Sequence, residues 1–218
     1  MDPAQLRKVR RERGWSQREA AARLGVSQAY LSMLESGRRN AAPLARRLMH
    51  VYGLPPTVLP VRAVREKVTS DFLARELAGL GYPGFAHLRR GGRNMNPAEF
   101  LLTALAQRNL EARVAEALPW LVLRYPDMSR DFLVREARAR NLQNRLGFVV
   151  ALARLAAHRD DLRALEQALA DSKLAKEDSF CKELNEAERA WLQEHSSEEA
   201  RQWHLLSDLR PAALHYVP

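Results

Sequence analysis

The chain is poor in cysteine and in aromatic residues. Cys181 is its only cysteine, which excludes an intrachain disulfide and a metal site built from several cysteines. Aromatic residues make up 7% of the 218 residues, and β-branched residues are few. Leu, Ala, Arg and Glu are abundant instead, and these residues lose little conformational freedom on entering a helix. This composition predicts an all-α protein.

Long apolar runs are also missing. No window approaches the roughly eighteen uninterrupted apolar residues that a membrane-spanning helix needs. The first fourteen residues carry five basic side chains and no apolar run, unlike a secretory signal peptide. We therefore expect a cytoplasmic protein that does not enter a membrane.

The net charge of +9 is unevenly distributed along the chain. Residues 1–62 carry 12 Lys and Arg against 4 Asp and Glu, and residues 63–159 carry 16 against 9. Residues 160–208 carry 6 against 13, so a basic front and a basic middle precede an acidic rear. Clustered positive charge favours a phosphate backbone or an acidic partner, although solvated helix faces can have the same composition.

Cap and turn residues divide the chain near residue 60. A capping box at Ser16–Glu19, a helix-ending Gly25 and a further cap at Ser27 predict short helices in close succession. A stretch with three prolines follows the fourth expected helix and marks a domain boundary. We expect one domain over residues 1–60 and a second helical domain over residues 61–218.

An offset of 32 residues relates two segments of the second domain. Arg108-Asn-Leu110 and Arg140-Asn-Leu142 each follow an apolar helical segment that begins with an acidic residue. Each triplet is followed at once by a second helical segment, so helical hairpins are expected over about 97–124 and 130–157. Such hairpins can stack into an α-solenoid-like array. The alternative is chance similarity between helices rich in Leu, Ala and Arg.

Caps, charge and glycine content predict the rest of the second domain. A helix over about 63–78 leads into a basic connector over 79–96, which holds five of the ten glycines together with Arg89, Arg90 and Arg93. The acidic rear, about 160–218, contains expected helices near 160–171, 185–194 and 197–208. We expect its large apolar side chains to lie in the core: Trp191, Trp203, Leu205, Leu206 and Tyr216.

The segment from Gln17 to Glu35 has the residue pattern of a helix-turn-helix. Ala21 is small where two helices would cross, and Gly25 can adopt the positive φ of the turn. The positions between the helices are apolar: Leu24, Val26, Leu31 and Leu34. With these residues the segment resembles the helix-turn-helix of the Cro and lambdoid-repressor (XRE) family, and the resemblance extends over about residues 4–59.

This resemblance implies a repressor-type domain that binds double-stranded DNA. In such domains the second helix crosses the DNA backbone and the third enters the major groove. Gln28 would then read an adenine, and Ala29 would contact a thymine methyl. The other DNA-binding residues that the resemblance implies are Gln17, Ser27, Tyr30, Ser32, Met33, Arg38 and Arg39. It also implies a structural ion pair between Arg10 and Glu35.

Two functions are compatible with such a domain. The first is a transcriptional regulator, an autoregulatory repressor that forms a homodimer and whose residues 63–218 dimerise or bind a small-molecule effector. The alternative is an antitoxin of a toxin-antitoxin system, in which the same residues bind and neutralise a toxin protein. We expect no catalytic residues, no metal site and no cofactor, because the six histidines lack a ligand spacing and the carboxylates occur as helix-surface charges.

Overall fold

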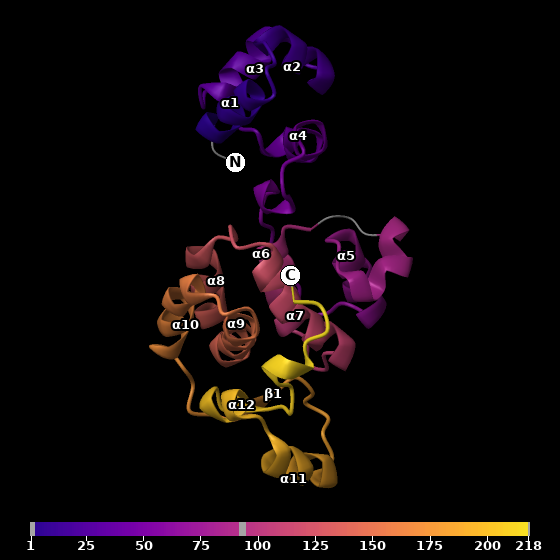
Figure 1. Cartoon of the computed structure of the whole chain (residues 1–218), viewed down its shortest axis with the longest axis vertical. Coiled ribbons are helices and arrows are strands. Elements are labelled where there is room, and N and C mark those ends of the chain that lie inside the picture. Colours follow the sequence, from indigo (N-terminus) through magenta and orange to yellow (C-terminus); the bar gives the residue numbers. More distant parts are fainter. Residues whose placement is uncertain (1–2, 92–94, 218) are drawn as a thin grey trace. The chain divides into compact units, whose positions relative to one another are not determined.

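A computed structural model of the chain describes residues 3–91 and 95–217 (Figure 1). Within these residues the regular structure is helical except for one pair of two-residue strands. The prediction of an all-α protein is confirmed. The chain divides into two compact units, residues 1–61 and 62–218.

The N-terminal unit is a small bundle of short helices. They are α1 (Pro3–Glu12), α2 (Gln17–Leu24), α3 (Gln28–Glu35) and α4 (Ala45–Tyr52), with 3-10 turns at Ala42–Leu44 and Pro56–Val58. The apolar stripe of each helix faces the others, as expected of amphipathic helices that share one core. The largest fully buried side chains of this core are Leu6, Leu24, Leu31, Leu34, Leu48 and Tyr52.

The C-terminal unit is larger and surrounds one buried helix. Its first helices are α5 (Ser70–Gly79), α6 (Pro97–Leu105), α7 (Ala112–Arg124), α8 (Arg130–Ala139) and α9 (Gln143–Ala157). They are followed by α10 (Arg163–Ala170), α11 (Glu186–His195) and α12 (Glu198–Gln202), with 3-10 turns at Pro83–Gly91, Asp160–Leu162 and Pro211–Ala213. Figure 1 shows α9 end-on between α7 and α10. Residues 143–153 of α9 are all buried, so α9 forms the centre of this unit.

The parallel strands β1 (Asp178–Ser179) and β2 (Leu205–Leu206) join two parts of the acidic rear. The helix predicted over 197–208 is therefore wrong beyond Gln202. The backbone of His204 adopts a left-handed conformation with φ 49°, and the next two residues pair with β1. The backbone hydrogen bonds of this segment thus go to a strand instead of a helix.

Two of the expected core side chains in the rear are exposed. Trp191 and Tyr216 are 49% and 43% exposed, so their assignment to the core is wrong. Trp191 lies on α11, which has no buried residue, and its ring stacks on His195 with 4.4 Å between the centroids. Trp203 and both leucines of β2 are buried as expected.

The helix predicted over about 63–78 begins later, at Ser70. The preceding residues form no helix because their backbone N–H groups donate to side chains of α6 and of Gln107, which follows this helix. These hydrogen bonds join Arg62 to Glu99, Arg65 to Thr103 and Val68 to Gln107, at 2.9, 3.3 and 3.0 Å. Partners more than thirty residues away in sequence thus replace the helical hydrogen bonds that the local sequence favours.

The connector predicted over 79–96 contains structure of its own. Tyr82 and Phe85 are buried, and the Tyr82 ring packs edge-on against Trp120 with 5.2 Å between the centroids. A 3-10 segment spans Pro83–Gly91. Arg93 falls outside the described residues. The assignment of this stretch to a plain connector is therefore wrong for its first half, which contributes aromatic side chains to the core.

Asn109 and Asn141 lie between helices, in the connections α6–α7 and α8–α9. Their geometries differ. Asn141 has a left-handed backbone with φ 57°, whereas the Asn109 side chain accepts a hydrogen bond from the backbone N–H of Lys182 at 3.0 Å. The internal repeat and its stacking as a solenoid stay predictions.

Candidate nucleic-acid interface

Caps on both sides of one glycine fix the turn between α2 and α3. Ser16 Oγ accepts a hydrogen bond from the Glu19 N–H, and the Glu19 carboxylate accepts one from the Ser16 N–H, at 3.2 and 2.8 Å. This capping box starts α2. Gly25 ends α2 with φ 61°, a conformation that side chains with a Cβ disfavour. Ser27 Oγ then accepts a hydrogen bond from the Tyr30 N–H at 3.1 Å and starts α3.

The short helix α3 has one buried face and one open face. Leu31 and Leu34 are almost completely buried in the core of the unit. Gln28, Ala29 and Ser32 are exposed, whereas Tyr30 and Met33 are partly buried. Because the apolar positions repeat every three to four residues, the first turn of α3 presents its polar side chains to solvent.

A buried ion pair ties α1 to the end of α3. Arg10 Nε and Nη2 donate to the two carboxylate oxygens of Glu35 at 2.5 and 3.0 Å, and Arg10 Nη1 donates to the Trp15 carbonyl at 2.7 Å. The side chains of Arg10 and Glu35 are 10% and 0% exposed. The structure also brings Gln17 to this pair, since Gln17 Nε2 donates to Glu35 Oε2 at 3.0 Å.

These neighbours keep Glu35 ionised. Burial raises the pKa of the Glu35 carboxyl, but the hydrogen bonds from Arg10 and Gln17 and the charges of Arg10 and Arg7 outweigh it. The pKa of Glu35 therefore lies below its ordinary value, and the hydrogen bond to Glu35 raises the pKa of Arg10. A buried charge that is paired and hydrogen-bonded in this way fixes the position of α3 relative to α1.

Sequence reasoning also missed the contact between Arg7 and this cluster. Arg7 Nη2 donates to the backbone carbonyl of Glu35 at 3.0 Å. Arg7 precedes Arg10 by three residues on α1, so both point to the same side of that helix. That spacing was the available signal.

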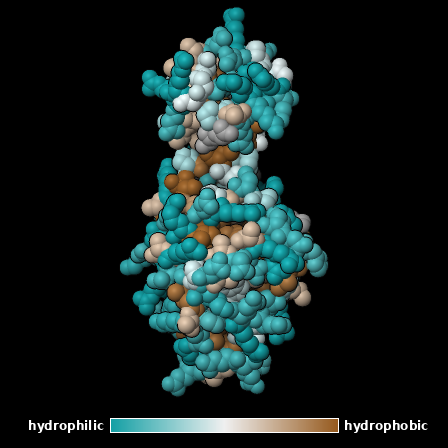
Figure 2. All heavy atoms as spheres, turned by 90° about the vertical axis from the view of Figure 1, so that its left-hand side faces the viewer, coloured by the Kyte–Doolittle hydropathy of each residue, from teal (hydrophilic) through white to brown (hydrophobic). Residues whose placement is uncertain are grey.

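The basic side chains of the N-terminal unit fall into two groups. Some hold the unit together, because Arg13 donates to the Tyr52 carbonyl at 2.6 Å and Arg47 to the Leu24 carbonyl at 2.8 Å. Arg38 and Arg39 begin three residues after the end of α3 and are exposed, and neither has an ion-pair partner among the described residues. Figure 2 shows hydrophilic side chains over most of the visible face of this unit.

Residues 3–91 and 95–217 contain no helix that is both long and apolar enough to cross a membrane. They also contain no group of three or more His, Cys, Asp or Glu side chains placed to hold a metal ion.

The N-terminal part of the chain is similar to a known family. Residues 4–60 match the helix-turn-helix domain family. A segment of 33 residues is 61% identical to the uncharacterized HTH-type transcriptional regulator y4dJ of Sinorhizobium fredii and covers 15% of this chain and 43% of that protein. The match thus spans less than half of the regulator. No solved structure matches the chain significantly. Residues 4–60 form a helix-turn-helix domain of the Cro and lambdoid-repressor (XRE) type.

Proposed function

We propose that the chain is a sequence-specific DNA-binding regulator of transcription and that α3 is its recognition helix. The observation that carries this proposal is the open polar face of α3, where Gln28 and Ser32 lie one turn apart and are exposed. An α-helix fits the major groove, where each base pair displays a distinct set of donors and acceptors. The buried opposite face of α3 holds this polar face on a rigid support.

The proposed base contacts lie in the first turns of α3. The Gln28 amide has the donor and acceptor that pair with adenine N7 and N6, and the Ala29 methyl can contact a thymine methyl. Ser32 and Met33 follow one turn later, and the partly buried Tyr30 lies in the sequence between Ala29 and Ser32. Ser32, Met33 and Tyr30 would contact neighbouring base edges or the adjacent backbone.

The proposed phosphate contacts surround this face. Ser27 Oγ accepts the hydrogen bond that caps α3, and its hydroxyl proton can be donated to a phosphate. Gln17 uses one amide N–H for Glu35 and keeps a second at the start of α2. Arg38 and Arg39 are exposed beyond the other end of α3 and supply charge that does not depend on DNA sequence.

We further propose that the regulator acts as a homodimer that represses its own promoter. One domain of this type reads a half-site, and two recognition helices about one DNA turn apart read a full operator. Sedimentation of the full chain should show a dimer. A monomer that still binds its operator as a monomer would contradict the dimer, and a foreign protein retained at one copy per chain would favour the antitoxin alternative.

Selection of binding sites from random DNA with the full chain tests the proposed function. We expect enrichment of two inverted half-sites whose centres lie about 10 base pairs apart. Enrichment of no sequence, with binding that depends on salt alone, would contradict sequence-specific recognition.

A further inference from the structure

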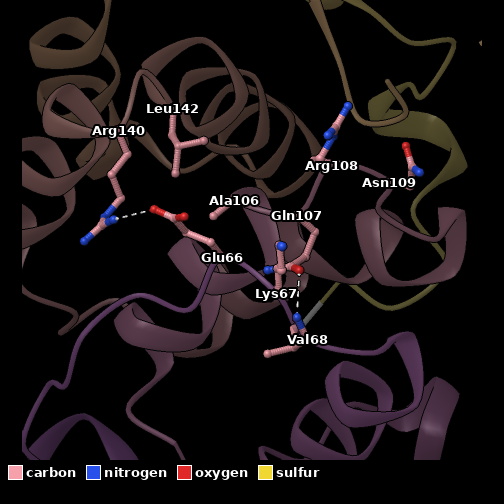
Figure 3. A pocket seen from close by; sticks show the side chains of 9 residues that line it. All are labelled: Glu66, Lys67, Val68, Ala106, Gln107, Arg108, Asn109, Arg140 and Leu142. Atoms are coloured by element: carbon pink, nitrogen blue, oxygen red, sulfur yellow. Dashed lines mark hydrogen bonds and ion pairs between the residues drawn. The ribbon is translucent and has the colours of Figure 1, made fainter. Parts of the chain in front are cut away.

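A cavity of about 470 Å³ opens in the C-terminal unit (Figure 3). Three separate segments line it: the non-helical residues before α5, the connection between α6 and α7, and the connection between α8 and α9. The lining residues are Glu66, Lys67, Val68, Ala106, Gln107, Arg108, Asn109, Arg140 and Leu142. The volume lies within the range of small-molecule sites, roughly 300–1,000 Å³.

The two Arg-Asn-Leu triplets of the sequence meet at this cavity. Arg108 and Arg140 are separated by 32 residues and occupy the first position of each triplet. Both line the same cavity although they belong to different pairs of helices. The shared sequence pattern therefore places two guanidinium groups around one space.

The Gln107 side chain lines the cavity and is fixed by hydrogen bonds at both ends of its amide. Gln107 Oε1 accepts a hydrogen bond from the Val68 N–H at 3.0 Å, and Gln107 Nε2 donates to the carbonyls of Arg65 and Thr103 at 2.9 and 2.6 Å. Gln107 is 5% exposed. Because the oxygen and the nitrogen of its amide both form hydrogen bonds, the position of the Gln107 side chain in the cavity wall is fixed.

Positive charge exceeds negative charge among the lining side chains. The cations Lys67, Arg108 and Arg140 line the cavity together with one acidic residue, Glu66. Lys67 and Arg108 have no ion-pair partner among the described residues. Figure 3 shows the Glu66 carboxylate directed toward Arg140 at one end of the cavity, with Arg108 and Asn109 at the other.

The two ion-pair contacts of Arg140 are long. Arg140 Nη1 lies 3.6 Å from a Glu66 carboxylate oxygen, and Arg140 Nε lies 3.6 Å from a carboxylate oxygen of Glu136. Both distances exceed a good N–H···O hydrogen bond. Arg140 Nε is buried and has no hydrogen-bond acceptor in the described part of the chain. The Glu66 side chain is 78% exposed, so an incoming anion can displace it.

We propose that this cavity binds a small organic oxyanion, a carboxylate or a phosphate ester. A planar pair of oxygens would engage the fork of Arg140 in place of Glu66, because a guanidinium pairs with such groups through two parallel hydrogen bonds. Lys67 and Arg108 would bind the remaining negative charge. The apolar body of the ligand would lie against Leu142, Ala106 and Val68. This binding does not depend on the proposed function of the N-terminal unit.

Calorimetric titration of the full chain tests the proposal at constant ionic strength. The probes are citrate, adenosine monophosphate and inorganic phosphate, which separate a carboxylate from a phosphate and an organic ligand from a free ion. We expect citrate or adenosine monophosphate to bind once per chain. Arg140→Gln should weaken that binding about tenfold or more, since it removes a charge-assisted pair of hydrogen bonds. Glu66→Gln should strengthen it.

Two further variants keep the test independent of folding. Lys67→Gln and Arg108→Gln remove side chains without an ion-pair partner among the described residues, so each should weaken binding without unfolding the chain. Arg113→Gln is the control with the same charge change, because Arg113 is exposed on α7 and does not line the cavity. Saturable binding by no probe, or equal weakening by the control, would overturn the proposal. The proposal would also be overturned if these variants weakened the binding of random duplex DNA but not the binding of any of the three probes. That result would assign these cations to a phosphate backbone.

Discussion

Gly147, in the middle of α9, lies against the indole ring of Trp203. A Cβ added to Gly147 would be 2.1 Å from Cζ3 and 2.3 Å from Cη2 of this ring. Trp203 is 1% exposed. The missing side chain at residue 147 therefore provides the space in which the segment after α12 packs onto the central helix of its unit.

Gly147→Ala should destabilise the chain even though alanine favours a helix. The overpacking costs about 1–3 kcal/mol and exceeds the gain in helix propensity of at most about 1 kcal/mol. Urea unfolding followed by circular dichroism measures the difference. The combined variant Gly147→Ala/Trp203→Phe should lose less than the sum of the single losses, because the smaller ring clears the clash. Trp203 Nε1 has no hydrogen-bond partner in the described residues, so Trp203→Phe breaks no such bond. A stabilised Gly147→Ala would contradict this packing.

Arg145 and Arg113 occupy equivalent places in the 32-residue offset but have opposite environments. Arg145 is 3% exposed and donates to the Asp178 carboxylate and to the carbonyls of Leu105, Gln107 and Ser179. Arg113 is exposed. Arg145→Met leaves three carbonyls without this donor, whereas Asp178 is 17% exposed and keeps Lys182, so the change should cost about 1–3 kcal/mol of unfolding free energy. Arg113→Met should change it by less than about 0.5 kcal/mol. Equal effects in urea unfolding would refute the assignment.

The Arg10–Glu35 pair should contribute far more to the free energy of unfolding than an exposed ion pair on α1 does. Arg10→Met removes a buried pair and should destabilise the N-terminal unit by about 3–5 kcal/mol. The control is Lys8→Met, because Lys8 lies 3.8 Å from Glu12 with both side chains exposed. Such a pair is worth about 0.3–0.5 kcal/mol. Thermal unfolding of both variants gives the comparison, and similar shifts in Tm would count against a structural role of Arg10.

Acidic pH should remove the contribution of the ionised Glu35 side chain to the free energy of unfolding. The pKa of Glu35 is lowered in the folded chain, despite burial, by hydrogen bonds from Arg10 and Gln17. A lowered folded pKa means that the unfolded chain binds the proton more readily, so the stabilisation is present above the unfolded pKa, about 4.3, and is lost below it as the pH falls through the folded pKa. The difference in unfolding free energy between the native chain and Glu35→Gln should therefore shrink from pH 7 to pH 3. A difference that stays constant over this range would contradict the pairing.

Local signals in the sequence predicted the helix-turn-helix. Segments whose structure depends on contacts with distant residues could not be predicted in this way. Ser16, Gly25 and Ser27 act within one turn of chain, so their cap functions can be predicted from sequence. The non-helical residues before α5 depend on Thr103 of α6 and on Gln107 just after this helix, which lie 38 and 39 residues further along the chain than their partners. No local pattern reports such partners.

The candidate sites differ in the same way. Exposure of Gln28 could be predicted because Leu31 and Leu34 fix which face of α3 is buried. The hydrogen bond from Gln17 to Glu35 joins residues 18 apart and depends on how α2 crosses α3. The cavity near Arg140 could not be predicted, because it requires three segments to meet in space.

The most direct test of recognition by α3 compares Gln28→Ala with Arg39→Ala on a selected operator and on a scrambled duplex, each titrated with salt. Loss of a bidentate base contact costs about 1–3 kcal/mol of discrimination, so Gln28→Ala should lower operator affinity and leave binding to the scrambled duplex nearly unchanged. Arg39→Ala should weaken binding to both duplexes alike and reduce the slope of log K against log salt by about 0.9. An unchanged ratio of operator to scrambled affinity for Gln28→Ala would contradict sequence reading by α3.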